Sequence, residues 1–389
     1  MSSSIDKVLA AAVAEGAVPN VAAIAADADG IVYEGAAGAV EAGSDGPSVS
    51  VDTQFRIMSM TKIVTTTAAL QLVEAGQLDL DAPVERYLPE FADRQVIAGF
   101  DSGADGDVPK LREPASRPTV KHLVTHTSGL GYWFFSDELV RWEAATGNPP
   151  LISGDALALT TPMVHDPGER YTYGINSDIL GKIIEAISGV TLDVVFKDKI
   201  TGPLGMDNTA FLMTDGQRAN STPVHVHGED GSWVSAGEIL NQEPGWWAGG
   251  HGLYSTPRDY IRFQRALLRG GELDGERILS SDTVDAMFTN QIGDLDFPAE
   301  IPSSDPASSC DFNAGPGWKW GLGLLLNSTD LPGMRRAWSG SWAGLCNTHF
   351  WVDRASGIAA SLYSNFLPFA DPPALQLYAD FERELYASR

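Results

Sequence analysis

Strands are predicted near both ends of the chain by the spacing of apolar and polar positions. Two short apolar runs, at 21–26 and 31–35, lie on either side of a turn that contains Gly30, and together they predict a β-hairpin. Residues 335–366 predict three further strands, separated by Gly-rich turns. Amphipathic helices flank these strands: the first is expected to end at Gly16, and the last closes the chain.

Helical spacing dominates the middle of the chain. Apolar residues recur at intervals of three and four from Ile179 to Ile187. Thr119 is placed as the N-cap of a helix that should end at Gly129. Residues 99–118 are rich in Gly, Asp and Pro, so a loop is predicted there.

This distribution predicts an α+β fold in two parts. Strands at both ends indicate one sheet domain assembled from residues 1–90 and 241–389, with helices packed on an antiparallel sheet. Residues 91–240 are predicted to form a mostly helical insertion. A functional site is then expected at the interface of the two parts.

Charge narrows the classes of partner. Among 389 residues, 26 Lys and Arg oppose 51 Asp and Glu, which gives a net charge of −25. Such a surface repels nucleic acids and anionic membranes, so neither is expected as a partner. No uncharged apolar run of about 18 residues and no signal peptide is found, which favours a cytoplasmic protein. Two cysteines, Cys310 and Cys346, make no disulfide framework.

Candidate chemistry begins with the segment FRIMSMTK, in which Ser59 precedes Lys62 by three residues at the predicted start of a helix. Residues three apart share one helix face. Serine is a poor nucleophile until a neighbour takes its proton, and a desolvated lysine is able to do so. An isolated Ser-x-x-Lys is usually surface decoration, so the assignment depends on what surrounds it.

The surroundings resemble a known family. FRIMSMTK, LVTHTSGL, PGERYTYGIN, GGHGLYSTPRDYIRF and WSGSWAG occur in the order found in class C β-lactamases, D-alanyl carboxypeptidases and the β-lactamase-like esterases of family VIII. The resemblance covers most of the chain and implies a β-lactamase/transpeptidase-like fold. It implies that Ser59 is acylated, that Lys62 and Tyr173 are the bases, and that the backbone amides of Ser59 and Ser341 form the oxyanion hole.

Two departures bear on the substrate. Ile175 stands where these enzymes usually have Asn, and Trp338-Ser339-Gly340 stands where β-lactamases have Lys-Thr-Gly. An indole cannot pair with a substrate carboxylate, which favours a neutral ester. Besides these four residues, aromatic residues in Gly-rich loops are expected to line the pocket: Tyr132, Trp133, Trp246 and Trp247.

Other sites are less favoured. His225 and His227 share one face of a possible strand, but no HExxH accompanies them, so no metal and no cofactor are expected. His126 is expected to support a helix end rather than to catalyse. No G-x-S-x-G elbow is found, which counts against an α/β-hydrolase.

The predicted function is therefore that of a serine carboxylesterase acting on small short- to medium-chain esters through an acyl-enzyme. The alternatives are a β-lactamase or D-aminoacyl peptidase, an acyltransferase to an alcohol other than water, and a catalytically silent binding scaffold. The sequence predicts neither the acyl and alcohol groups nor the oligomeric state.

Overall fold

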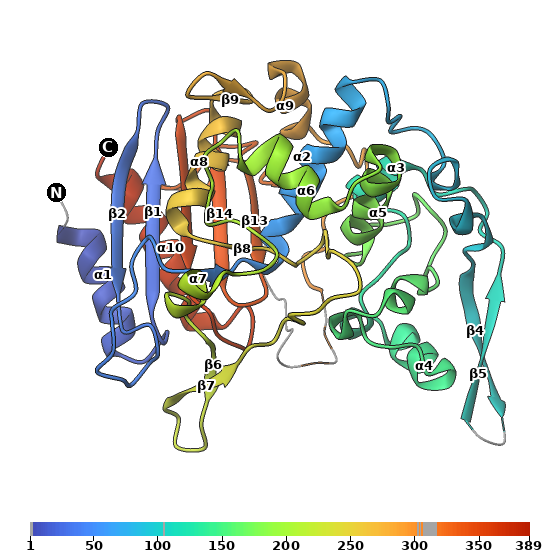
Figure 1. Cartoon of the computed structure of the whole chain (residues 1–389), viewed down its shortest axis with the longest axis horizontal. Helices are drawn as coiled ribbons and strands as arrows, with labels where there is room; N and C mark the ends of the chain where they lie inside the picture. The colour runs from blue at the N-terminus through green and yellow to red at the C-terminus, as the bar shows by residue number, and fades with distance from the viewer. Residues whose placement is uncertain (1–2, 104–105, 302, 304, 306–316) are drawn as a thin grey trace.

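A seven-stranded antiparallel sheet forms the centre of the computed structural model, which describes residues 3–103, 106–301, 303, 305 and 317–389 (Figure 1). The strand order is β11-β12-β13-β14-β15-β1-β2, so strands from the two ends of the chain lie side by side. The strands are β1 Val21–Ala26, β2 Ile31–Ala37, β11 Lys319–Trp320, β12 Leu325–Leu326, β13 Gly340–Gly344, β14 Thr348–Asp353 and β15 Ile358–Tyr363.

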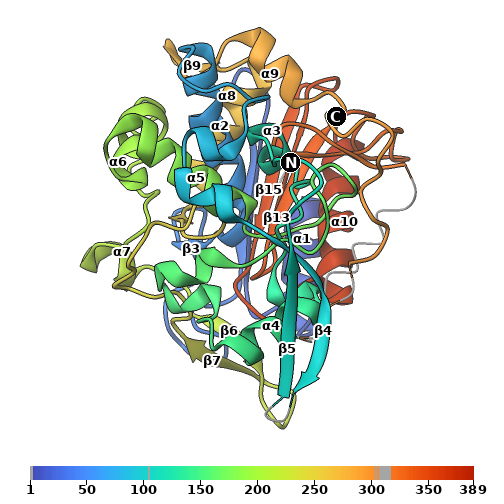
Figure 2. The same ribbon diagram turned by 90° about the vertical axis from the view of Figure 1, so that its right-hand side faces the viewer.

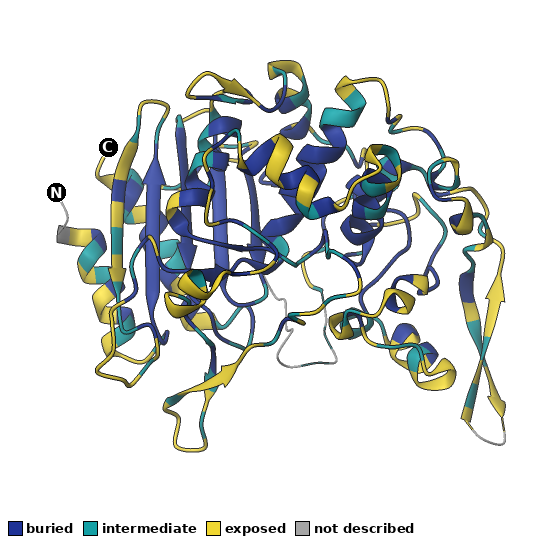
Figure 3. Cartoon of the chain, in the orientation of Figure 1, coloured by how far each residue is buried: buried dark blue, intermediate teal, exposed yellow. Residues whose placement is uncertain are grey.

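Both faces of this sheet are covered by helices, which Figure 2 separates into layers. On one face lie α1 (Ser3–Ala14) and α10 (Pro372–Ala387), packed on the odd-numbered residues of β1. On the other lie α2 (Thr61–Glu74) and α8 (Pro257–Leu268), with the even-numbered residues of β1 in the larger core. Because successive side chains in a strand point to opposite faces, β1 is buried along its whole length (Figure 3).

The remaining elements lie mostly between β2 and β11 in the chain. The helices are α3 Val120–Val124, α4 Asp137–Thr146, α5 Asn176–Ser188, α6 Leu192–Phe196, α7 Asp215–Ala219 and α9 Ser281–Met287. The short strands are β3 Phe55–Arg56, β4 Val96–Gly103, β5 Gly106–Arg112, β6 Val224–His227, β7 Trp233–Gly237, β8 Tyr254–Ser255, β9 Glu272–Leu273 and β10 Glu276–Arg277. Short 3-10 or π turns are η1 Met58–Met60, η2 Val84–Arg86, η3 Pro89–Asp93, η4 Trp133–Phe135, η5 Leu151–Ser153, η6 Ala156–Thr160 and η7 Lys197–Thr201.

The predicted α+β fold with its antiparallel sheet is confirmed, and so are the first hairpin, the three late strands and the closing helix. Thr119 caps α3 as expected, but that helix ends at Val124, before Gly129. The exact division at 90 and 240 stays a prediction. Cys346 is a buried free thiol, and Cys310 lies outside the described residues.

The loop predicted for 99–118 is wrong up to Arg112, because β4 and β5 form an antiparallel pair there, whereas 113–118 are irregular as predicted. Tertiary contacts from α4 override the turn-forming composition. Arg141 of α4 forms an ion pair with Asp107 at 2.6 Å and places its guanidinium over the Phe100 ring at 4.1 Å. Much of the hairpin is exposed (Figure 3).

Among the described residues, no helix has the length and apolar character needed to cross a bilayer.

Candidate active site

Ser59 lies in η1, the turn that joins β3 to the buried helix α2. The residue before it, Met58, has a φ of 45°, a conformation that costs a non-glycine residue about 1–2 kcal/mol. The end of β13 approaches this turn closely, because a Cβ on Gly344 would lie 2.3 Å from the Ile57 carbonyl oxygen. Glycine at 344 therefore allows the central sheet to reach the serine.

Lys62 occupies the first turn of α2, and its side chain is fully buried. Its Nζ lies 3.1 Å from Ser59 Oγ, 2.9 Å from Tyr132 Oη and 2.8 Å from the Gly250 carbonyl oxygen. Burial lowers the pKa of Lys62 to about 7, against the opposing charge of Asp178. An amine in this state is available as a proton acceptor near neutral pH.

Tyr173 lies next to Lys62, in the loop just before α5. The Lys62 ammonium lies 4.6 Å from the centre of its ring. The Tyr173 hydroxyl accepts a hydrogen bond of 3.2 Å from the indole Nε1 of Trp342, on β13. Ser59, Lys62 and Tyr173, which the sequence singles out, are thus brought together between α2, the start of α5 and the sheet.

His126 packs against Tyr173 and holds the loop that carries it. His126 has a φ of 56°, and its ring packs 5.1 Å from the Tyr173 ring. Its carbonyl oxygen accepts the Thr172 amide, and its Nδ1 lies 3.0 Å from Asn176 Nδ2. Burial keeps the pKa of His126 well below its usual value. His126 therefore has a supporting role at this loop, as the sequence analysis expects.

An apolar cavity of about 240 Å³ opens over Ser59. Tyr132 and Trp133 line it as predicted, whereas Trp246 and Trp247 line a smaller adjoining cavity of about 40 Å³. The two cavities share Leu151, Ile152 and His251. Further side chains of the larger cavity come from several loops and β13: Met58, Phe134, Phe135, Tyr173, Ile239, Asp305, Trp342, Ala343, Leu345, Leu367 and Phe369.

The structure places Trp338, Ser339 and Gly340, predicted as the third motif, outside the cavity over Ser59. Trp338 is 44% exposed and precedes β13, so it does not reach the cavity. Ser339 donates its hydroxyl to the Arg336 carbonyl, and Gly340 packs beneath Leu324 and Phe288. The Trp-x-Gly triplet beside Ser59 is instead the one that begins with Trp342. A second triplet in WSGSWAG was the signal that could have identified it.

Two further predicted residues lie outside the cavity over Ser59. Ser341 is absent from its lining and faces a different hollow, next to Arg335 and Tyr378. Ile175 is buried as the residue before α5 and also does not line the cavity. Residues close to them in sequence make contacts at the site instead. Ala343 lines the cavity, and Asn176 lies within hydrogen-bond distance of His126.

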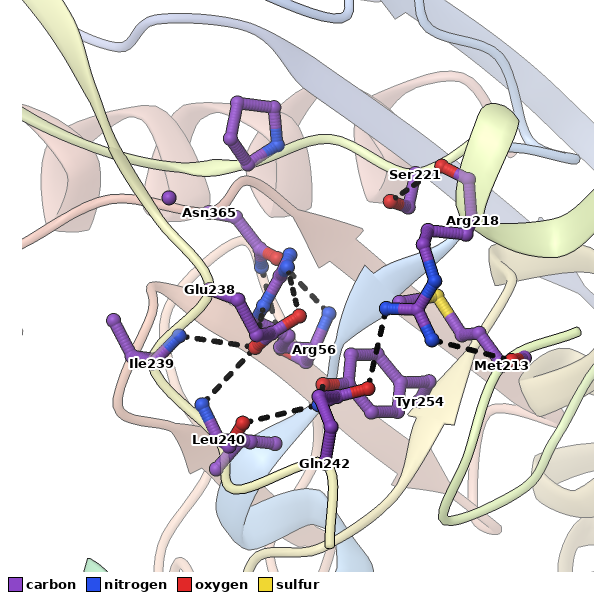
Figure 4. Close-up of polar contacts among 12 residues, drawn as sticks. Arg56, Met213, Arg218, Ser221, Glu238, Ile239, Leu240, Gln242, Tyr254 and Asn365 are labelled. Atoms are coloured by element: carbon purple, nitrogen blue, oxygen red, sulfur yellow. Dashed lines mark hydrogen bonds and ion pairs between the residues drawn. The ribbon is translucent and has the colours of Figure 1, made fainter. Parts of the chain in front are cut away.

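One wall of the cavity is held by an ion pair that the sequence analysis did not identify (Figure 4). The Arg56 side chain of β3 is only 4% exposed and donates to Glu238 through Nε at 2.8 Å and Nη2 at 2.5 Å. Glu238 also accepts the amides of Ile239 and Leu240, each at 3.0 Å. These two residues line the larger and the smaller cavity, so the pair ties the strand before Ser59 to both cavities.

His225 does not serve as part of a metal cluster. Its Nε2 accepts the Ala42 amide at 3.1 Å, and its Nδ1 faces the Asn365 carbonyl at 3.1 Å. Within the described ranges, no group of three or more His, Cys, Asp or Glu side chains has the arrangement of a metal site.

Comparison with known proteins places this geometry in a family. A family model described as Beta-lactamase matches residues 5–384. Monacolin J acid methylbutanoyltransferase of Aspergillus terreus is 31% identical over 363 residues, covering 88% of this chain and 84% of that protein. Lovastatin esterase of Penicillium rubens is 29% identical and covers 98% of each chain. The simvastatin synthase LovD of Aspergillus terreus, in its LovD6 mutant form, superposes with a TM-score of 0.85 at 28% identity over 99% of this chain and 96% of its own. This chain therefore belongs to the beta-lactamase family.

Proposed function

We propose that this protein is a serine carboxylesterase that cleaves small, uncharged carboxylic esters through an acyl-enzyme on Ser59. The observation that carries the proposal is the fully buried Lys62 amine, 3.1 Å from the Ser59 hydroxyl at the floor of an apolar cavity. A surface serine without a catalytic role would need no buried amine beside it. The retained pairing also disfavours a catalytically silent scaffold.

In the first half-reaction, Ser59 Oγ attacks the ester carbonyl carbon and its proton passes to neutral Lys62. The tetrahedral oxyanion is stabilised by backbone amides, a contribution worth about 3–4 kcal/mol per donor in other hydrolases. One donor is the Ser59 amide. We place the second near Leu345, at the end of β13 that abuts η1, in place of Ser341, because Ser341 does not line the cavity. The intermediate then expels the alcohol and leaves Ser59 acylated.

Tyr173 is suited to the proton transfers at the leaving and entering oxygens. Tyr173 lines the cavity, its hydroxyl accepts from the Trp342 indole, and Lys62 Nζ, which becomes charged when it takes the Ser59 proton, lies over its ring. A donor and a neighbouring positive charge both stabilise a tyrosinate. Tyr173 therefore protonates the departing alkoxide and, in the second half-reaction, takes the proton of the attacking water. As the acid leaves, Lys62 returns its proton to Ser59 Oγ, 3.1 Å away, which restores both groups.

The cavity favours an uncharged substrate. Among the described residues, its lining includes no arginine and no lysine, and Lys62 already has three hydrogen-bond partners. A carboxylate-bearing β-lactam would lose its hydration there without gaining a cationic partner. Apolar acyl and alcohol groups would instead gain about 25 cal/mol for each Å² buried.

Acyl transfer to an alcohol is the second candidate, and a specific observation favours it. Aromatic and aliphatic side chains surround Ser59, a setting in which a bulky apolar alcohol competes well with water for the acyl-enzyme. One of the relatives is named as a methylbutanoyltransferase and another as an esterase, so both outcomes of the same acyl-enzyme occur among similar proteins.

The test follows the acyl group. Purified protein is given p-nitrophenyl esters of rising chain length, with and without an apolar alcohol, and products are separated by chromatography. We expect release of p-nitrophenol, a phosphonate adduct on Ser59 by peptide mass spectrometry, and no turnover by Ser59→Ala with an unchanged melting temperature. An adduct on another serine, or a chromogenic cephalosporin cleaved as fast as the best ester, would overturn the proposal. A rise in transferred ester with alcohol concentration selects the second candidate.

A further inference from the structure

Asp178 is a buried carboxyl group next to the Ser59–Lys62 pair that the chemistry above does not use. It lies in the first turn of α5, and none of its side chain is exposed. Its Oδ1 accepts the Gly250 amide at 2.7 Å. The carbonyl oxygen of Gly250 accepts a hydrogen bond from Lys62 Nζ at 2.8 Å. Gly250 therefore connects the carboxylate to the amine.

This connection depends on close approach. A Cβ on residue 250 would lie 2.6 Å from Asp178 Oδ2, so only glycine leaves room for the carboxyl group. Oδ2 itself has no hydrogen-bond partner among the described residues. A buried carboxylate oxygen without a partner costs folding free energy. A group kept at such a cost beside a reacting amine points to a role in function.

The charged and titratable groups around this carboxyl come from several elements. Burial raises the pKa of Asp178 to about 6 against the charge of Lys62 on α2, so Asp178 is a carboxylate at pH 7. Its charge in turn acts on Lys62. His251 places Nδ1 3.8 Å from Asp178 Oδ1, and burial lowers the pKa of His251 to about 3, so the imidazole is neutral. Tyr132, from the loop before η4, contacts Lys62 and keeps its proton. His126, behind Tyr173, is neutral as well.

We propose that Asp178 is a positioning residue of the acyl-transfer reaction, which acts through Gly250 to hold the Lys62 amine on Ser59 and supplies the counter-charge for the ammonium that Lys62 becomes. The proton moves from Ser59 Oγ to Lys62 Nζ as the Oγ–carbon bond forms, and Asp178 remains a carboxylate throughout. The proposal rests on the proposed function, since it assigns Asp178 a role in that same reaction.

The decisive variant is Asp178→Asn, which keeps the size and the acceptor for Gly250 but removes the charge. Activity requires neutral Lys62, so kcat/KM rises with pH through the pKa of that amine. Loss of a nearby opposite charge lowers a lysine pKa by about one unit or more. We therefore expect the acid limb to move about one unit to lower pH, and the plateau kcat to fall about tenfold because the ammonium is less stabilised. KM should change little.

The matched control is Asp259→Asn, on α8. Asp259 is also a buried carboxyl with a raised pKa, but it accepts hydrogen bonds from the Asn208 amide and the Thr209 hydroxyl. This variant should lower the melting temperature and leave the pH midpoint of kcat/KM unchanged. A folded Asp178→Asn protein with the wild-type pH midpoint and kcat would overturn the proposal. So would an equal shift in both variants.

A second measurement covers the case in which Asp178→Asn fails to fold. Carboxyl carbons of aspartate labelled with ¹³C are titrated by NMR in the wild type and in Lys62→Met. Removal of the lysine charge should move one raised aspartate titration further upward, and unchanged titrations would overturn the inference. The phosphonate adduct on wild-type Ser59 keeps the two proposals distinguishable: with the adduct present and Asp178→Asn unaltered, only the role of Asp178 fails.

Discussion

Lys62 combines two properties that are rarely found in one lysine: full burial and three hydrogen-bond partners. With its pKa lowered to about 7, roughly half of the molecules carry a neutral amine at pH 7, whereas an ordinary lysine is almost entirely charged there. Burial supplies this shift, and Asp178 limits it. The ability of Ser59 to lose its proton thus depends on how its neighbour is packed.

At the same scale, we expect opposite effects on activity from substitutions of the two tryptophans in WSGSWAG. Trp342→Phe removes the donor to the Tyr173 hydroxyl, and a hydrogen bond to a charged group contributes about 1.5–3 kcal/mol. We expect kcat/KM for a short p-nitrophenyl ester to fall roughly tenfold or more. Trp338→Phe is the matched control, because that side chain is exposed and outside the cavity, and its activity should stay near wild type. A larger loss in Trp338→Phe would restore the first triplet as the functional one.

At the scale of elements, the site is assembled from segments that hold one another in place. The β3–η1–α2 segment presents Ser59, β13 closes on it through Gly344, and the start of α5 carries Tyr173. The loop that begins at Glu238 is attached to β3 by the Arg56 ion pair (Figure 4). The cavity wall is therefore attached to the strand that precedes the nucleophile.

Breaking that attachment should change specificity as well as stability. Glu238→Gln leaves Arg56 buried with a weaker partner, and we expect a loss of about 1–3 kcal/mol in the free energy of unfolding. Because the neutral amide oxygen is a weaker acceptor for the Ile239 amide, KM should rise more for p-nitrophenyl octanoate than for the acetate. Thermal unfolding and steady-state kinetics measure the two effects. The control is Asp380→Asn, which breaks an exposed pair with Arg383 worth about 0–1 kcal/mol. Equal KM changes for both esters would contradict the wall assignment.

At the scale of the whole molecule, packing of the sheet stabilises the fold and the net charge opposes it. The sheet joins both ends of the chain and is buried on both faces, so its stability comes from packing. The whole chain carries an acidic surplus of 25, since 51 Asp and Glu exceed 26 Lys and Arg. Ion pairs with all available cations would still leave this surplus unpaired, and like charges repel in the compact state.

The melting temperature should therefore rise with sodium chloride over the first few hundred millimolar. Salt shortens the screening length to about 10 Å at 0.1 M, which weakens the repulsion. Differential scanning calorimetry at fixed pH measures the rise, and choline chloride should reproduce it if screening is the cause. A flat curve would mean that the carboxylates are too far apart to repel, and an effect of sodium alone would indicate specific cation binding.

The sequence by itself determined the features that depend on short separations along the chain. Ser59 and Lys62 meet because residues three apart share a helix face, and the strands at 21–26 and 340–363 follow from apolar runs between turns. Tyr173 was recognised from its order in the family pattern rather than from any contact. These inferences required no knowledge of the packing.

Only the tertiary structure decided the rest. Trp338 and Trp342 are four residues apart, so in a continuous strand both would point to the same face. The sequence therefore could not select between their triplets. The choice depends on where β13 begins and on the contact of Gly344 with Ile57. Lys62 reaches Tyr132 across 70 residues and Gly250 across 188. Burial of the lysine arises from these distant partners, because the dielectric around a side chain is set by everything packed against it and not by its neighbours in sequence.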